Sequence, residues 1–320
     1  MNMILITEFM NRGAVAKLSA ERRTVYAPGL ADNQDKLPAM MPGVRALIVR
    51  NRTQVTKAVL SAAPDLKCVG RLGVGLDNID QAACAGCGVT VIAAGGANTV
   101  SVAEYVLTAI LVLLRNAYQA GDQMLAGGWP RMECSGREVA GKTLGLIGFG
   151  ATARETAARA RALGMNICAH DPLLAPGDAA WRQARRLDLE ELLENADAVS
   201  LHVPLTADTR HLINAGRLSR MKPGAVLINA ARGGVVDEKA LADRLRAGGL
   251  FGAALDVFET EPLTAEAARC FHGLHNLILT PHIAGVTEES NSRVSLLIAR
   301  RVLEVLEEKG EAGHGSTCSA

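Results

Sequence analysis

The sequence predicts an α/β protein with two doubly wound parallel sheets, and three observations lead to this prediction. The first hundred residues alternate short β-branched runs with helical stretches, the pattern of a parallel sheet with helices on both faces. The same alternation starts again at Gly141 and accounts for a complete second sheet. The length of 320 residues suits two domains, and an apolar content of 49% is that of a globular chain.

The elements of the first domain follow one another from the N-terminus. The predicted strands are residues 3–6, 46–49, 68–71 and 89–92, and the predicted helices between them are residues 55–63 and 79–85. A long helix follows over residues 101–120, and its middle, residues 105–114, is apolar almost all round. A helix without a polar face has to be buried on every side. We therefore expect this helix to lie between domains or between subunits.

The second domain contains its own set of strands. They are predicted at residues 143–147, 166–170, 198–201, 225–229, 252–255 and 277–279, with a helix over 153–163 after the first strand and a last helix over 289–308. Ligands of open α/β sheets bind beyond the carboxyl ends of the strands. The segments that follow these strands are therefore the first places to search for functional residues.

Composition excludes several classes of partner. The chain has 34 basic and 33 acidic residues, and its net charge of +1 creates no field that attracts DNA, RNA or an anionic membrane. Aromatic residues make up only 3%, too few for a base-stacking surface. We therefore expect a small-molecule ligand rather than a nucleic acid or a membrane.

The N-terminus and the cysteines predict a cytoplasmic protein. The first residues lack the basic segment of a secretory signal, and the most apolar stretch, residues 106–114, is about half of a ~20-residue membrane span. Seven dispersed cysteines are typical of reduced thiols rather than of a disulfide framework. Cys84 and Cys87 form a lone C-x-x-C pair without further ligands nearby, so we predict no metal site.

A glycine-rich turn joins the first strand of the second domain to its helix. Read as G-x-G-x-x-G/A, it consists of Gly148, Gly150 and Ala153. Gly148 permits a tight turn, Gly150 lets the backbone approach a pyrophosphate, and Ala153 lets the helix pack closely on the strand. The N–H groups of Ala151 and Thr152 would face the phosphates at the positive end of the helix.

The motif alone is weak, but a carboxylate at the expected distance strengthens it. Asp171 ends the next strand, 21 residues after Gly150. A carboxylate in this place hydrogen-bonds the ribose hydroxyls of NAD and repels the 2′-phosphate of NADP. The sequence therefore predicts NAD as the cofactor. The alternative is that Asp171 only forms a turn ahead of Pro172.

Ionisable side chains follow three consecutive strands near the end of the second domain. They are Arg232, the pair Asp256 and Glu261, and His282. A His can donate a proton to a carbonyl oxygen, a neighbouring Glu can orient the imidazole and favour its charged form, and an Arg can clamp a carboxylate bidentately. Taken singly, each could be a surface ion pair, a solvated carboxylate or a half-buried imidazole. Their order at consecutive strand ends favours a site for ketone reduction.

The chain resembles the D-isomer-specific 2-hydroxyacid dehydrogenases, and among them the phosphoglycerate-dehydrogenase-like branch. The resemblance covers roughly residues 46–305. Besides the glycine turn, its motifs are VGRLGVGLDNID at 69–80, GANTVSVAE at 96–104, LHVPLT at 201–206, the segments around Arg232 and Glu261, and TPHIAG at 280–285.

The resemblance also implies an architecture. Residues 1–98, completed by 286–320, correspond to a flavodoxin-like substrate-binding domain, and residues 99–285 to a Rossmann domain that binds NAD. Members of the family close on their substrate like a hinge and pair through the cofactor domain. The resemblance therefore implies a homodimer that forms through the region of helix 101–120.

The resemblance assigns roles to individual residues. Arg232 would orient the substrate, His282 would be the acid/base, and Glu261 would pair with it. Asp256, with the backbone of Ala230 and Ala231, would hold the nicotinamide carboxamide. Other cofactor contacts are expected at Val74, His202, Val203, Pro204 and Gly285, in addition to the glycine turn and Asp171, and substrate contacts at Arg50, Asn51, Val74, Gly75, Asn98 and Arg232.

The substrate is less well defined by the sequence than the reaction. Arg50 and Arg52 follow a strand of the first domain and would suit an acidic group on C3, as in 3-sulfolactate or 3-phosphoglycerate. The alternative is that both side chains face solvent and that the enzyme is a glyoxylate or hydroxypyruvate reductase. A third alternative is a non-catalytic NADH-sensing protein similar to corepressors that resemble this family.

Overall fold

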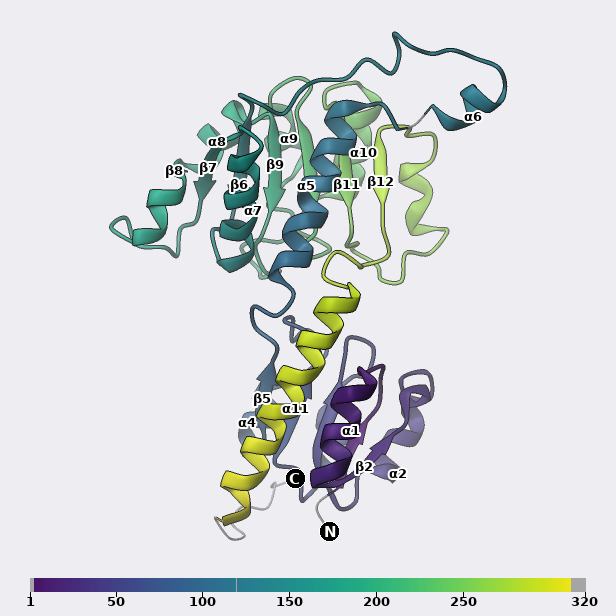
Figure 1. Cartoon of the computed structure of the whole chain (residues 1–320), viewed down its shortest axis with the longest axis vertical. Coiled ribbons are helices and arrows are strands. Elements are labelled where there is room, and N and C mark those ends of the chain that lie inside the picture. The colour runs from purple at the N-terminus through teal and green to yellow at the C-terminus, as the bar shows by residue number, and fades with distance from the viewer. Residues whose placement is uncertain (1–2, 119, 312–320) are drawn as a thin grey trace. The chain divides into compact units, whose positions relative to one another are not determined.

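The chain forms two compact units, seen here in a computed structural model that describes residues 3–118 and 120–311. Unit 1 consists of residues 1–98 and 286–320, and unit 2 consists of residues 99–285. Residues 312–320, the end of the predicted returning segment, lie outside the described residues. Figure 1 shows the helices and strands of each unit.

Unit 1 is built on a five-stranded parallel sheet with the order β2-β1-β3-β4-β5. This is the strand order of flavodoxin-like folds, so that prediction is confirmed. The strands are β1 (Met3–Ile6), β2 (Arg23–Tyr26), β3 (Val44–Val49), β4 (Cys68–Arg71) and β5 (Thr90–Ala93).

Helices cover both faces of this sheet because successive strand residues point to opposite sides. Ile4, Ile6 and Ile48 are buried on the face of α1 (Arg12–Glu21) and α11 (Glu288–Glu311). Leu5, Leu47 and Val49 are buried on the face of α3 (Lys57–Ser61) and α4 (Gln81–Gly86). The carboxyl ends of all five strands therefore meet at one edge between these two layers.

Unit 2 is built on a seven-stranded sheet with the order β12-β11-β10-β9-β6-β7-β8, in which all neighbouring strands are parallel. Counted from its own first strand, six of the strands have the Rossmann order 3-2-1-4-5-6, as predicted. The strands are β6 (Thr143–Ile147), β7 (Asn166–His170), β8 (Arg185–Arg186), β9 (Ala198–Leu201), β10 (Val226–Asn229), β11 (Gly252–Leu255) and β12 (Leu277–Leu279).

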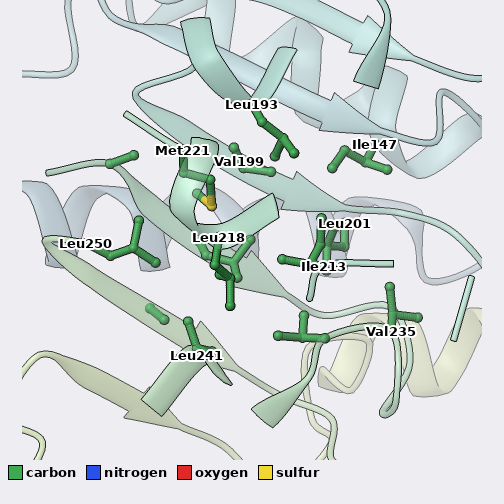
Figure 2. Close-up of a cluster of buried hydrophobic side chains, with 14 of the residues drawn as sticks. Ile147, Leu193, Val199, Leu201, Ile213, Leu218, Met221, Val235, Leu241 and Leu250 are labelled. Carbon is green, nitrogen blue, oxygen red and sulfur yellow. The ribbon is translucent and has the colours of Figure 1, made fainter. Parts of the chain in front are cut away.

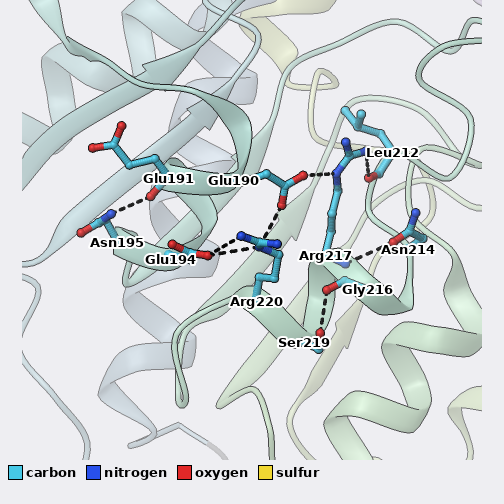
Figure 3. A network of polar contacts seen from close by, with 10 residues as sticks. All are labelled: Glu190, Glu191, Glu194, Asn195, Leu212, Asn214, Gly216, Arg217, Ser219 and Arg220. Carbon is cyan, nitrogen blue, oxygen red and sulfur yellow. Dashed lines mark hydrogen bonds and ion pairs between the residues drawn. The ribbon is translucent and has the colours of Figure 1, made fainter.

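Two layers of helices cover the seven-stranded sheet. One face carries α5 (Thr99–Arg115) and α7 (Ala151–Ala162). The other carries α8 (Leu189–Asn195), α9 (Ala215–Arg220) and α10 (Glu238–Arg246), whose leucines pack with Val199 and Leu201 of β9 (Figure 2). Ion pairs from Glu190 to Arg217, at 3.0 Å, and from Glu194 to Arg220, at 2.7 Å, join α8 to α9 at the surface (Figure 3).

Short helices complete the structure. They are η1 (Pro28–Asp32), η2 (Gln34–Lys36), α2 (Leu37–Met40), α6 (Gly121–Leu125), η3 (Ala179–Gln183) and η4 (Ala267–Phe271). None of the helices in the described residues is long and apolar enough to cross a membrane. The cytoplasmic location stays a prediction.

The long apolar helix differs from its prediction in length and in surroundings. α5 ends at Arg115 instead of residue 120. Most of its side chains are buried within unit 2, where it packs against α7, β10 and β11. Glu104, Thr108 and Arg115 form a narrow exposed strip along it. The sheet of its own unit, not a neighbouring domain or subunit, therefore provides the burial that its apolar surface requires.

The two cysteines of the C-x-x-C pair differ from each other. Cys84 is a buried free thiol, and burial together with nearby Asp80 raises its pKa to about 11. Cys87 is half-buried and disulfide-bonded. Cys68, Cys134, Cys168 and Cys270 are free thiols as well, so Cys87 is the exception among the described cysteines to the expected reduced thiols.

Candidate active site

The glycine turn between β6 and α7 has the geometry of a phosphate-binding turn. Gly148 has a φ of +84°, and a Cβ on it would lie 2.6 Å from the carbonyl oxygen of His202. Gly150 begins α7, and no atom lies within 4 Å of the position of an added Cβ. No side chain caps α7, so its first N–H groups can bind an anion that occupies this space. These residues fit the pyrophosphate of NAD, and buried Ala153 lets the helix pack closely on the sheet, as expected.

The carboxylate of Asp171 is fixed beside this turn. Its Oδ2 accepts a hydrogen bond of 2.8 Å from the Phe149 N–H, and its Oδ1 accepts one of 3.0 Å from the Leu173 N–H. A carboxylate can accept about four hydrogen bonds, so capacity remains for the hydroxyls of a ribose. Asp171 therefore shapes the turn and can also bind a ribose, which combines the two alternatives that the sequence left open.

The segment after β9 lies against the same turn, because Gly148 approaches the backbone of His202 and the side chain of Val203. The His202 Nε2 lies 3.0 Å from the Ser200 hydroxyl. Burial lowers the pKa of His202 to about 4, so its imidazole is neutral near pH 7. A neutral imidazole in this place contributes polar surface beside the turn but no charge. Pro204, the next predicted contact, is exposed.

A histidine–carboxylate pair lies beyond the carboxyl ends of β11 and β12. The Nδ1 of His282 lies 2.7 Å from Glu261 Oε2, and Glu261 Oε1 accepts a 3.0 Å hydrogen bond from the Phe258 N–H. Burial tends to raise the pKa of Glu261, but these hydrogen bonds and the charge of Arg232 hold that pKa below its usual value. The ionised carboxylate fixes the proton on Nδ1 and leaves Nε2 to exchange a proton with a ligand.

Arg232 follows β10 in a loop that packs against the Glu261 loop. A Cβ on Gly233 would lie only 1.7 Å from the carbonyl oxygen of Phe258, so only glycine permits this approach. The loop is also held from within, since the Asn229 side chain accepts from the Ala231 N–H and donates to the Arg232 carbonyl. The structure therefore brings together Arg232, Glu261 and His282, as the order of strand ends predicts.

Asp256 anchors the loop that carries His282. Its side chain is buried, and it accepts hydrogen bonds from the Thr280 hydroxyl at 2.6 Å and from the N–H groups of Ile283 and Ala284, each at 2.8 Å. Because Thr280 donates to Asp256, its hydroxyl accepts from Tyr105 of α5, at 2.6 Å. Sequence reasoning assigns no role to the side chain of either Thr280 or Tyr105. The predicted contact of Asp256 with a nicotinamide stays a prediction.

The predicted substrate residues of unit 1 lie at the carboxyl edge of its sheet. Arg50 and Asn51 follow β3, Val74 and Gly75 follow β4, and Asn98 follows β5. Val74 and Asn51 are exposed, whereas Arg50, Gly75 and Asn98 are half-buried. Among the predicted residues of this edge, Arg50 is a half-buried cation, and Val74 and Gly75 belong to a glycine-rich loop.

The two arginines of this edge differ in their contacts. The Arg50 guanidinium donates a 2.9 Å hydrogen bond to Asn291 in the first turn of α11. Arg52 is exposed and forms an ion pair with Asp32. Arg50 is therefore held at the sheet edge by another side chain, while Arg52 belongs to the surface. No cluster of three or more His, Cys, Asp or Glu side chains that could hold a metal occurs in the part of the chain that the structure describes.

A Rossmann unit with a phosphate-binding turn and an Arg, Glu and His set defines a nicotinamide-dependent oxidoreductase. Residues 107–284 match the family model described as D-isomer specific 2-hydroxyacid dehydrogenase, NAD binding domain. The chain belongs to this family and is an NAD-dependent 2-hydroxyacid dehydrogenase. This assignment confirms the predicted family, reaction and cofactor, and it identifies an enzyme rather than a non-catalytic sensor.

Individual relatives show how far the likeness extends. The (S)-sulfolactate dehydrogenase of Chromohalobacter salexigens is 54% identical over 307 residues, which cover 96% of this chain and 99% of that protein. The hydroxypyruvate reductase of Thermotoga maritima is 40% identical over 273 residues, which cover 85% of this chain and 88% of that protein. The D-3-phosphoglycerate dehydrogenase of Mycobacterium leprae is 39% identical over 300 residues, which cover 94% of this chain but only 56% of that protein.

A solved structure supports the fold. The D-lactate dehydrogenase from Aquifex aeolicus, crystallised with NAD and lactic acid, is 27% identical, with a TM-score of 0.83 and 100% of both chains covered. The two proteins thus share one fold. The chain spans about half the length of the phosphoglycerate dehydrogenase above, whereas it matches the sulfolactate dehydrogenase and this lactate dehydrogenase over nearly their whole length.

Proposed function

We propose that this enzyme interconverts a 2-hydroxy acid and a 2-keto acid that carry an anionic group on C3, of the 3-sulfolactate or 3-phosphoglycerate type. The observation that carries the proposal is the half-buried guanidinium of Arg50, which Asn291 holds at the carboxyl edge of the sheet of unit 1. A fixed guanidinium binds a sulfonate, phosphate or carboxylate through two parallel hydrogen bonds. The name of the 54% identical relative, a sulfolactate dehydrogenase, agrees with this substrate class.

The residues of the site divide the reaction between them. Arg232 and the N–H groups of Val74 and Gly75 bind the substrate carboxylate, with Asn51 and Asn98 as further polar contacts. His282 donates a proton from Nε2 to the C2 oxygen during reduction and accepts one during oxidation. Glu261, 2.7 Å from Nδ1, stabilises the charged imidazole between these steps. NAD, when bound, would supply the hydride chemistry at C2.

The cofactor contacts belong to the same proposal. Gly148, Gly150 and the N–H groups of Ala151 and Thr152 hold the pyrophosphate, and Asp171 binds the ribose. The family resemblance assigns the nicotinamide end to His202, Val203, Pro204, Ala230, Ala231, Asp256 and Gly285 of unit 2 and to Val74 of unit 1. The open space at Gly150 supports the pyrophosphate contacts, and the remaining acceptor capacity of Asp171 supports the ribose contact.

Replacing Arg50 tests the substrate class. We expect Arg50→Ala to lower the ratio of kcat/KM for 3-sulfopyruvate or 3-phosphohydroxypyruvate to that for glyoxylate by at least about tenfold, the loss expected for a charge-assisted hydrogen bond. The measurement is the initial rate of NADH oxidation with each keto acid. Arg52→Ala is the matched control and leaves the ratio unchanged, because Arg52 already pairs with Asp32. Equal losses on all keto acids in Arg50→Ala would remove the basis for the proposal.

The second candidate is a hydroxypyruvate or glyoxylate reductase without an anionic C3 requirement. The 40% identical hydroxypyruvate reductase of Thermotoga maritima favours it. The same panel of keto acids separates the two candidates in the wild-type enzyme. Faster turnover of hydroxypyruvate and glyoxylate than of both acidic keto acids, at equal subsaturating concentrations, would support this second candidate.

We propose further that a second copy of the chain covers an exposed apolar arm of unit 2, defined as residues 120–134. Four large side chains of this arm are exposed, namely Met124, Leu125, Trp129 and Met132. Monomeric proteins rarely expose apolar side chains in such a group unless they form an interface. Figure 1 shows α6 on a loop that extends outward from the sheet of unit 2. The arm begins five residues after the end of α5, so we place the expected dimer contact in this arm instead of in the buried helix.

Introducing charged side chains into the arm tests the proposed dimer. The double variant Leu125→Asp with Trp129→Asp is expected to sediment as a 33.6 kDa monomer, whereas the wild-type enzyme is expected to sediment at twice that mass. Leu173→Asp is the control, since Leu173 is 95% exposed but lies outside the arm. A double variant that still sediments as a dimer would contradict the proposed contact.

A further inference from the structure

A buried carboxylate lies directly beneath the loop that carries Arg50. Glu8 follows β1 and is only 4% exposed. Its Oε1 accepts hydrogen bonds from the N–H groups of Arg50, at 2.8 Å, and Thr53, at 2.9 Å. Its Oε2 accepts a third, at 3.2 Å, from the Arg52 N–H. One side chain from the end of β1 thus binds three backbone groups of a loop more than forty residues away in the sequence.

These contacts fix the backbone of residues 50–53 from both sides. A buried carboxylate is costly unless hydrogen-bond donors surround it, so the N–H groups of the loop have to converge on Glu8. Asn78 binds the opposite groups, since its side-chain amide donates to the carbonyls of Thr53, at 2.6 Å, and Arg50, at 3.3 Å. Thr53 is fully buried, and its hydroxyl lies 2.9 Å from that of Thr7. The backbone of the loop therefore has a single arrangement in which its donors and acceptors are satisfied.

The arrangement determines where the guanidinium of Arg50 lies. The backbone of Arg50 is held by Glu8 and Asn78, and its guanidinium by Asn291. Burial holds the pKa of Arg50 below its usual value, although the charge of Glu8 acts in the opposite direction. The guanidinium is thus partly desolvated and prevented from turning outward as Arg52 does. A cation in this state binds an anion strongly because little conformational freedom is lost on binding.

We propose that Glu8 is a positioning residue for substrate selection, which holds Arg50 in the geometry that binds an anionic C3 group. Glu8 does not touch the substrate, and it acts only through the loop at residues 50–53. This inference rests on the proposed role of Arg50, and it adds a residue to which the sequence motifs gave no role. The charge that selects the substrate is on Arg50, and the carboxylate that keeps it in place is on Glu8.

Substitution of Glu8 tests the inference through a ratio of substrates. In Glu8→Gln the amide oxygen can keep the bonds to Arg50 and Thr53, but the amide nitrogen faces the Arg52 N–H and both groups are donors. We expect the KM for 3-sulfopyruvate to rise about tenfold more than the KM for glyoxylate, which has no C3 group. Glu8→Asp keeps the charge but shortens the side chain, and we expect a smaller change in the same direction. This second variant retains the buried charge that the fold requires, so it provides a test even if Glu8→Gln does not fold.

The controls separate this inference from the proposed function. Glu21→Gln removes an exposed carboxylate of unit 1 and is expected to leave the ratio unchanged. A folded Glu8→Gln or Glu8→Asp enzyme with the wild-type ratio, or with equal losses on both keto acids, would overturn the role of Glu8. If Arg50→Ala lowers the ratio and the Glu8 variants do not, only this inference is wrong. If Arg50→Ala leaves the ratio unchanged, the proposed substrate class is wrong.

Discussion

Replacing His282 with Asn is expected to lower kcat by about 10²–10⁴-fold while NADH still binds, because the variant loses the group that exchanges a proton with the C2 oxygen. His282 has a φ of +52°, in the left-handed region that most side chains avoid. Asn adopts this region more readily than other residues, so the loop keeps its conformation in the variant. The loss of rate then reports the missing imidazole rather than a displaced loop. The measurements are kcat with the preferred keto acid and the Kd of NADH by fluorescence titration.

The control for this variant is His272→Asn, an exposed histidine of the same unit; the histidine–carboxylate pairs among the described residues involve His211 and His282 instead. It is expected to retain the wild-type kcat. If His282→Asn turned over at a rate near that of the wild-type enzyme, His282 would not be the proton donor. A loss of NADH binding in that variant would instead mean that the loop shapes the cofactor site more than it supplies a proton.

The pattern of apolar residues predicted most strands of both sheets, and the strands that it missed were missed for physical reasons. The central strands of both sheets are buried on two faces and therefore form continuous apolar runs. β2 and β8 are edge strands, and β8 has only two residues, so neither shows such a run. α5 was recognised as a buried helix, but hydropathy alone does not reveal which surface covers it. α5 lies against the sheet of its own unit, and this contact depends on how residues distant in the sequence pack together.

Some residues of the candidate site could likewise be predicted from the sequence, whereas others could be found only in the structure. Arg232, Glu261 and His282 could be found because strand ends in a parallel sheet meet at one edge. Glu8 could not, because its partners are backbone N–H groups, which leave no pattern of residue types in the sequence. The difference between Arg50 and Arg52 depends on Asn291 and Asp32, which come from remote parts of the chain. Roles that depend on a neighbour's side chain therefore need the structure.

The second large effect is expected at Asp256, which determines the shape of the His282 loop. Its Oδ1 accepts from the Thr280 hydroxyl and the Ile283 N–H, and its Oδ2 accepts from the Ala284 N–H. In Asp256→Asn, an amide oxygen can replace Oδ1, but the amide nitrogen then faces the Ala284 N–H and neither group can accept. An unsatisfied buried donor costs about 1–3 kcal/mol, so the free energy of unfolding should fall by that amount.

The same substitution should also affect catalysis. The bonds to Ile283 and Ala284 hold the chain immediately after His282, whose left-handed backbone costs about 1–3 kcal/mol and persists only where the surroundings enforce it. Without one of these bonds the imidazole is no longer fixed against Glu261, and we expect kcat to fall at least about tenfold, since small displacements of a positioned group are costly. Denaturant unfolding and steady-state kinetics measure the two effects.

Asp237→Asn provides the matched control, because Asp237 caps α10 by accepting from the Ala240 N–H, and Asn caps helices as well as Asp does. This control should change neither stability nor kcat. The Kd of NADH separates the two roles considered for Asp256. A lower kcat with an unchanged Kd identifies an anchor of the His282 loop. A higher Kd with an unchanged kcat would contradict that role and would support the contact with the nicotinamide carboxamide that the family resemblance implies.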